Sequence, residues 1–186
     1  PICGHDFAKE EEKKLKEFNM TEVELIDRSP FRWIRVFDTD KCLMASGFNG
    51  FAMIVNLHDT FFGFTKPRNG RLRVVSAGTK KQAIASADDF LRGIESNGNA
   101  KKNKRWLNEP VSEKQKSILI KKGYRINPFD FSWTKYKAAC LIYYLYNKKE
   151  VDFLIYKNQK EIKIREKSER IRRERLEYLN RISGRT

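Results

Sequence analysis

Short apolar and aromatic runs separated by turn-forming residues fill the chain between residues 31 and 77. Runs of β-branched and aromatic residues bounded by Asp, Asn and Gly are typical of strands in an antiparallel meander. We therefore expect four or five strands, in a region whose character changes to β from Glu22 onward. The expected strands are 31–37, 41–48, 50–57, 60–66 and 71–77, with turns at 38–40, 49–50, 58–59 and 68–70.

A helix is expected directly after the last strand. Thr79 and Gln82 have the spacing of a capping box, in which the threonine oxygen accepts from the third amide of the helix. One apolar face should cover one side of the sheet. Its residues are Ala83, Ala87, Phe90, Leu91 and Ile94. The aromatic residues expected to fill the core of this β-rich module are Trp33, Phe37, Phe48, Phe51, Phe61, Phe62 and Phe64.

The next part of the chain predicts two helices in a hairpin. Ser112 and Gln115 form a second capping box, Pro110 keeps the preceding residue out of a helix, and Gly123 suits a C-terminal cap. A second helix should begin near 132–134, after a loop that holds Pro128. Its apolar positions recur at helical spacing and are Tyr136, Ala139, Cys140, Tyr143, Tyr144 and Leu145.

The apolar pattern breaks at 147–149, and the residues from Lys157 onward are polar and helix-prone. Pairs such as Glu166 with Arg170, four residues apart, would support an exposed helix. The expected fold is therefore α+β: a small antiparallel meander with a packed helix, then a helical hairpin and a basic C-terminal helix. The expected division is a linker or zinc-ribbon remnant at 1–20, a sheet-and-helix module at 21–97, a helical module at 100–156 and a basic tail at 157–186.

The positive charge is concentrated in two segments. The chain carries a formal net charge of +15, but residues 1–99 hold 15 basic against 14 acidic residues. Residues 100–137 hold 11 against 3, and residues 157–186 hold 11 against 5. An excess of this kind favours an anionic partner, of which nucleic acid is the first to consider. The expected phosphate contacts are Lys101, Lys102, Lys104, Arg105, Lys114, Lys121, Lys122, Arg172 and Arg173.

Two further sets of residues leave alternatives open. Trp106, beside the first four of these cations, is expected to anchor the hairpin rather than to stack on bases. Six strand cations are either backbone contacts or ordinary solvated positions, since strand alternation exposes them in both cases. They are Arg32, Arg35, Lys66, Arg68, Arg71 and Arg73.

Neither catalytic nor metal-binding residues are expected. The chain has no GxxxxGK[ST] loop and no DEAH motif, and a structural zinc site needs four ligands, of which Cys3 and His5 would supply half. His58 is read as a turn residue, and acidic pairs such as Asp88 and Asp89 as surface features. Without an apolar run of about 18 residues no membrane span is expected. Three widely spaced cysteines and no signal core indicate a cytoplasmic segment cut from a longer chain.

The central stretch carries a set of residues at characteristic spacing: Arg105-Trp106-Leu107, Pro110, Ser112, Lys114-Gln115, Lys122-Gly123, Thr134-Lys135 and Ala138. This pattern resembles a segment near the C-terminus of bacterial and phage superfamily-2 DEAD/DEAH-box helicases. The opening residues 1–7 look like the second half of a CPxCG zinc ribbon. The resemblance implies an accessory region that holds DNA against motor domains of the same parent chain, with ATP and Mg²⁺ bound there and no cofactor here. An alternative is a protein-interaction module that docks on the motor domains or on a replication or repair partner.

Overall fold

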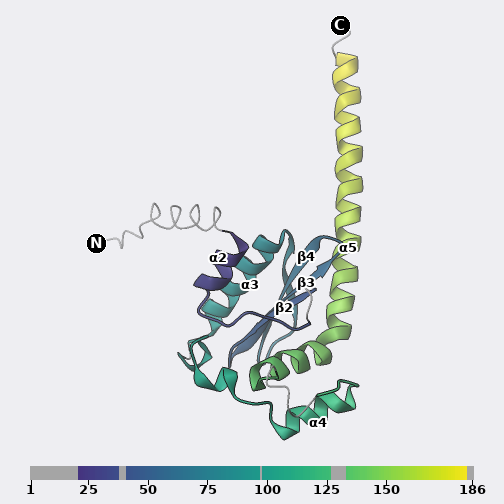
Figure 1. Cartoon of the computed structure of the whole chain (residues 1–186). Coiled ribbons are helices and arrows are strands. Elements are labelled where there is room, and N and C mark those ends of the chain that lie inside the picture. The colour runs from purple at the N-terminus through teal and green to yellow at the C-terminus, as the bar shows by residue number, and fades with distance from the viewer. Residues whose placement is uncertain (1–20, 38–40, 97, 127–132, 184–186) are drawn as a thin grey trace, which may run out of the picture. The chain divides into compact units, whose positions relative to one another are not determined.

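The computed structural model describes residues 21–37, 41–96, 98–126 and 133–183, and Figure 1 follows them along the chain. Two compact units succeed each other, Pro1–Asn147 and Lys148–Thr186. The first unit holds a sheet and most of the helices. The second holds the remainder of the last helix.

The first unit is built on a five-stranded antiparallel meander. Its strands are β1 (Ile34–Arg35), β2 (Cys42–Ser46), β3 (Gly50–Leu57), β4 (Thr60–Pro67) and β5 (Arg73–Gly78), ordered β1-β2-β3-β4-β5. The meander predicted from the apolar runs is confirmed, although β1 is much shorter than expected. His58 and Asp59 both have positive φ, 48° and 63°, as a tight turn between β3 and β4 requires. The turn predicted at 38–40 lies outside the described residues.

Helix α3 (Lys80–Ile94) covers one face of the sheet. Thr79 caps it through the predicted capping box, with Gln82 N donating to Thr79 Oγ1 at 3.2 Å. Ala83, Ala87 and Leu91 are buried against a core that Phe31, Trp33, Leu43, Ala45, Ala52 and Ile54 supply. The predicted apolar face is confirmed, because Phe90 and Ile94 also pack on this core.

A short helix, α2 (Glu22–Arg28), precedes the sheet and corrects the expectation that β character begins at Glu22. Thr21 and Glu24 form a capping box, with Thr21 N donating to Glu24 Oε2 at 2.7 Å. These hydrogen bonds hold the pKa of the Glu24 carboxyl below its usual value, because they favour the charged form. Leu25 and Ile26 pack on the same core as α3. The Thr-x-x-Glu spacing at Thr21 and Glu24 indicates a helix start. The apolar runs that follow favoured a strand interpretation instead.

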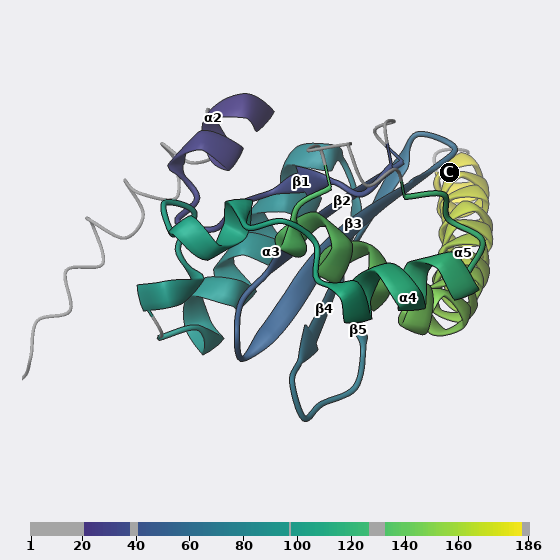
Figure 2. The same ribbon diagram turned by 60° about the horizontal axis from the view of Figure 1, so that its bottom comes forward.

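The second face of the sheet packs against the first turns of α5 (Lys135–Ser183). Strand register places Met44 opposite Met53 and Met53 opposite Phe64, and all three side chains are buried. Tyr136 of α5 is 1% exposed, and its hydroxyl accepts from Ser46 N at 2.8 Å and donates to Arg32 O at 2.7 Å. Burial raises the pKa of Tyr136, so its hydroxyl stays protonated as a donor. Figure 2 shows α3 and the first, green turns of α5 beside the strands.

Helix α4 (Glu113–Lys121) confirms the capping box at Ser112, where Gln115 N donates to Ser112 Oγ at 3.3 Å. Gly123 has φ +86°, the left-handed conformation predicted for its C-terminal cap. The segment before α4 pairs with the start of α5, as Val111 N donates to Trp133 O at 3.2 Å and Lys135 N donates to Glu109 O at 2.7 Å. Pro128 lies outside the described residues.

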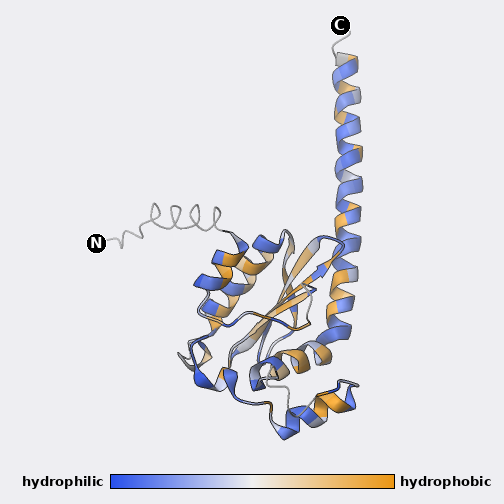
Figure 3. Cartoon of the chain, in the orientation of Figure 1, coloured by the Kyte–Doolittle hydropathy of each residue, from blue (hydrophilic) through white to orange (hydrophobic). Residues whose placement is uncertain are grey.

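Helix α5 is longer than the pattern indicated, because it continues through 147–149 to Ser183. Asn147 is 7% exposed, and its Nδ2 donates to Tyr143 O at 2.7 Å, four residues back along the helix. The polar residue that suggested a break is therefore satisfied within the helix. The part of α5 in the second unit is mostly hydrophilic, as Figure 3 shows. The boundaries of the four predicted parts stay a prediction, and α5 crosses the one at 156/157 without a break.

Candidate nucleic-acid interface

The basic cluster, defined as Lys101, Lys102, Lys104 and Arg105, lies between and within two 3-10 turns, η1 (Gly98–Ala100) and η2 (Arg105–Asn108). Lys104 is half-buried and the other three side chains are exposed. Lys102 is anchored to α2 and to the segment after it, because its Nζ donates to Asp27 O within α2 and its N donates to Pro30 O at 2.7 Å. The cluster is thus presented on a fixed backbone rather than on a free linker.

Three further predicted cations lie on α4. Lys114 is its second residue, Lys121 its last and Lys122 its C-cap, and all three are exposed. Lys114 and Lys121 are seven residues apart, which places them on the same side of the helix. Lys122 Nζ lies 5.8 Å from the centroid of the Tyr146 ring, a cation–π distance.

The predicted cations of the first unit differ from neighbouring lysines in whether they form ion pairs. Within the described part of the chain, none of the seven predicted cations of the first unit forms an ion pair. By contrast, Lys116 Nζ lies 2.7 Å from Glu113 Oε1, and Lys135 Nζ lies 3.0 Å from Glu109 Oε2. The two acidic residues that the structure describes in this region, Glu109 and Glu113, are therefore paired with lysines outside the predicted set. The seven predicted cations therefore have no carboxylate partner among the described residues, although Lys102 Nζ donates to Asp27 O and Lys122 lies over the Tyr146 ring.

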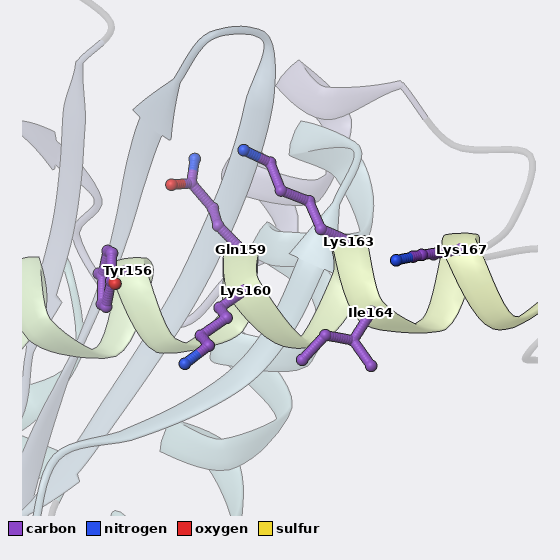
Figure 4. A pocket seen from close by; sticks show the side chains of 6 residues that line it. All are labelled: Tyr156, Gln159, Lys160, Lys163, Ile164 and Lys167. Atoms are coloured by element: carbon purple, nitrogen blue, oxygen red, sulfur yellow. The ribbon is translucent and has the colours of Figure 1, made fainter.

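In the second unit, Arg172 and Arg173 are exposed on α5 and likewise form no ion pair with the described residues. A separate set on this helix, the lysine stripe, consists of Lys160, Lys163 and Lys167. Figure 4 shows these side chains with Tyr156, Gln159 and Ile164 around a shallow pocket, all from α5. At about 100° per residue, Arg172 and Arg173 lie about 120–140° around the axis from Lys167.

The lysine stripe was not among the predicted contacts. Lysines at i, i+3 and i+7 share one face of a helix, so the spacing itself carries the signal. The lysine stripe does not stand out in the sequence because basic residues occur throughout the tail. The tail therefore presents cations on more than one side, and the stripe is the set that the helical period brings together.

The two described cysteines are both buried. Burial raises the pKa of the Cys42 and Cys140 thiols to about 12, so neither is a thiolate nucleophile near neutral pH. Among the described residues no three His, Cys, Asp or Glu side chains gather as a metal site would require. Cys3 and His5 of the predicted ribbon remnant lie outside them. No helix in the described ranges has the length and apolarity to cross a membrane.

Comparison with known proteins gives one match that covers most of the chain. A family model described as the C-terminal domain of the mitochondrial helicase Irc3 matches residues 6–170. Neither a curated protein nor a solved structure matches. Because the match spans the meander, both 3-10 turns, α4 and most of α5, it includes all predicted cations except Arg172 and Arg173. The chain therefore belongs to the family of Irc3-type helicase C-terminal domains.

Proposed function

We propose that this region is a non-catalytic, nucleic-acid-binding accessory domain of a superfamily-2 DNA helicase. The observation that carries the proposal is the set of seven cations in residues 101–122 that form no ion pair with a described residue, in a chain of a helicase C-terminal family. Cations of this kind release counterions when they meet phosphates, which gives affinity without base specificity. The domain would hold a branched or single-stranded substrate against the motor.

The chemistry of unwinding would lie elsewhere in the parent chain. ATP and Mg²⁺ would be bound by motor domains, whose phosphate loop and acidic metal ligands have no counterpart in these 186 residues. The DEAD/DEAH assignment and the bacterial or phage origin stay predictions from the resemblance. The family is named for a mitochondrial helicase, so a mitochondrial location is an alternative to the predicted cytoplasmic one.

A protein-interaction role is the second candidate, and exposed apolar side chains in the second unit favour it. Ile171, Leu176, Tyr178, Leu179 and Ile182 are each more than half exposed on α5. An apolar stripe on a charged helix is a common way to dock on another helix or on a groove. The partner would be the motor domains of the same parent chain or a replication or repair protein.

Two variants that remove equal charge test the phosphate-contact role. Lys101→Gln/Arg105→Gln removes two cations without ion pairs, whereas Lys80→Gln/Lys116→Gln removes two that are paired with Glu22 and Glu113 at 3.0 and 2.7 Å. In fluorescence anisotropy with forked DNA, we expect the first variant to bind about tenfold more weakly and the second to change by less than about twofold.

Equal losses in the two variants would mean that DNA responds only to net charge, and the basic cluster would not be a contact surface. Circular dichroism of both variants checks that the fold is retained. An interaction module would instead show little effect of either variant on DNA and a loss of binding to the motor domains.

A further inference from the structure

A cavity of about 450 Å³ lies in the first unit, within the size range of small-ligand sites. Four segments that are distant in sequence line it: the turn between β2 and β3, the end of β4, η2, and the first turns of α5. The α5 residues at its wall include Tyr136, Tyr143 and Asn147. Their spacing of seven and four residues places them on one face of the helix.

Aromatic rings form much of this wall. Phe51 and Tyr143 are stacked, with centroids 5.3 Å apart and an interplanar angle of 18°. Trp106 contacts both Phe48 and Tyr136, with ring centroids 5.6 Å and 5.7 Å apart. Trp106 therefore lies in the cavity wall, in addition to the anchoring role predicted for it. Two rings of this set retain exposed surface, since Phe48 is 43% exposed and Tyr143 is 42% exposed.

The ring of Phe48 is carried on a turn that is fixed in place. Glu95, at the end of α3, accepts from Phe48 N at 2.5 Å and from Asn49 N at 2.9 Å. Asn49 Nδ2 also donates to Ile94 O at 3.0 Å. Phe48 was predicted to fill the core, and that prediction is wrong. A large apolar ring that lines a cavity, on a turn held by three hydrogen bonds, is preorganised for contact with a ligand.

Cations supply the polar part of the wall. Lys66 Nζ donates to Asn147 Oδ1 at 2.7 Å, which leaves two of its three protons for a ligand. Arg68, two residues further along, is exposed at the rim. None of the described residues that line the cavity is acidic. The Glu95 carboxylate, which does not line the cavity, is hydrogen-bonded to the amides of the turn. Flat aromatic surfaces beside two cations are complementary to a planar base joined to a phosphate.

We propose that this cavity receives an unpaired nucleobase of single-stranded DNA. The base stacks on the exposed surfaces of Phe48 and Tyr143, and the adjoining phosphate lies near Lys66 and Arg68. Stacking on aromatic side chains is sequence-tolerant and contributes a large part of the affinity for single strands. This inference rests on the proposed function, and it adds a contact that distinguishes unpaired from paired DNA.

The test compares two strands with the same phosphates. Anisotropy of the whole 186-residue chain is measured with oligothymidylate of about 20 nucleotides and with an abasic strand of equal length. We expect the thymidylate strand to bind about tenfold more tightly than the abasic strand. Phe48→Ala/Tyr143→Ala should abolish this difference and leave abasic binding unchanged. The control Phe153→Ala removes an aromatic side chain that is 62% exposed outside the cavity and should preserve the difference.

Tyr143→Phe keeps the ring and should retain the preference for bases, which separates stacking from any role of the hydroxyl. Equal binding of the two strands by the unaltered chain overturns the cavity proposal while the phosphate role stands. If the preference for thymidylate over the abasic strand survives Phe48→Ala/Tyr143→Ala, the cavity proposal is likewise overturned and the phosphate role stands. Failure to bind either strand overturns both proposals and favours an apolar segment of a protein partner as the occupant.

Discussion

Charge reversal of the basic cluster, Lys101→Glu with Lys102→Glu, Lys104→Glu and Arg105→Glu, should lower affinity for DNA by about a hundredfold at about 0.1 M salt. Each substitution removes one counterion-releasing contact and brings a carboxylate toward the phosphates. The fold should tolerate the change, because three of the four side chains are exposed and none forms an ion pair with a described residue. The backbone hydrogen bond from Lys102 N to Pro30 O is unaffected by side-chain identity, and Lys102→Glu removes only the bond from Lys102 Nζ to Asp27 O.

Anisotropy titrations at several salt concentrations measure this effect. The log-log salt slope should decrease in magnitude by about 2.8 to 3.6, because about 0.7 to 0.9 is lost for each of four phosphate contacts. Thermal unfolding of the variant serves as the control for stability. Affinity within about twofold of the unaltered chain, with the slope unchanged, would remove the cluster from the proposed interface.

Asp88→Ala should destabilise the first unit by about 3 kcal/mol. The Asp88 side chain is buried, and its Oδ1 accepts from Ser29 Oγ at 2.5 Å and from Trp33 Nε1 at 3.2 Å. Its Oδ2 lies 2.7 Å from Arg92 Nε. These contacts join α3 to the segment between α2 and β1, and truncation leaves two buried donors without an acceptor. Arg92 is half exposed, so water replaces much of its lost pair.

The neighbouring aspartate provides a matched control. Asp89 is exposed on the same helix, so Asp89→Ala should change the free energy of unfolding by less than about 0.5 kcal/mol. Asp88→Asn keeps an acceptor for Ser29 and Trp33 and should fall between the two. Urea denaturation followed by tryptophan fluorescence measures all three variants. Equal midpoints for Asp88→Ala and Asp89→Ala would contradict the structural role given to Asp88, which the sequence suggested was a surface feature.

The elements that local sequence determines were predictable. Turn residues between apolar runs gave the strands of the meander, and the capping boxes at Thr79 and Ser112 gave the starts of α3 and α4. Each of these signals involves residues within a few positions of one another, so no knowledge of tertiary packing is needed. The segment at 22–28 was misread because the following apolar runs outweighed its own capping box at Thr21.

The length of α5 and the cavity depend on contacts between distant segments. Asn147 broke the apolar pattern, yet it lies inside a helix because its side chain bonds Tyr143 O within the helix and Lys66 of β4 across the unit. Phe48 was assigned to the core on its residue type, but it is 43% exposed on a turn that is hydrogen-bonded to Glu95, 47 residues later. Neither the helical position of Asn147 nor the exposure of Phe48 can be predicted from the residues next to it in sequence. The lysines of residues 101–135 that form ion pairs with described residues, Lys116 and Lys135, cannot be told from the others by local sequence either.

Salt dependence of DNA binding tests the central claim most directly. Anisotropy of the 186-residue chain with single-stranded, duplex and forked DNA, repeated across salt concentrations, reports how many phosphates are contacted. We predict binding at low salt that weakens steeply, with a slope corresponding to several phosphates, and tighter binding to DNA that contains unpaired strands. Absence of binding at low salt would contradict the account and would assign the +15 charge to a protein partner.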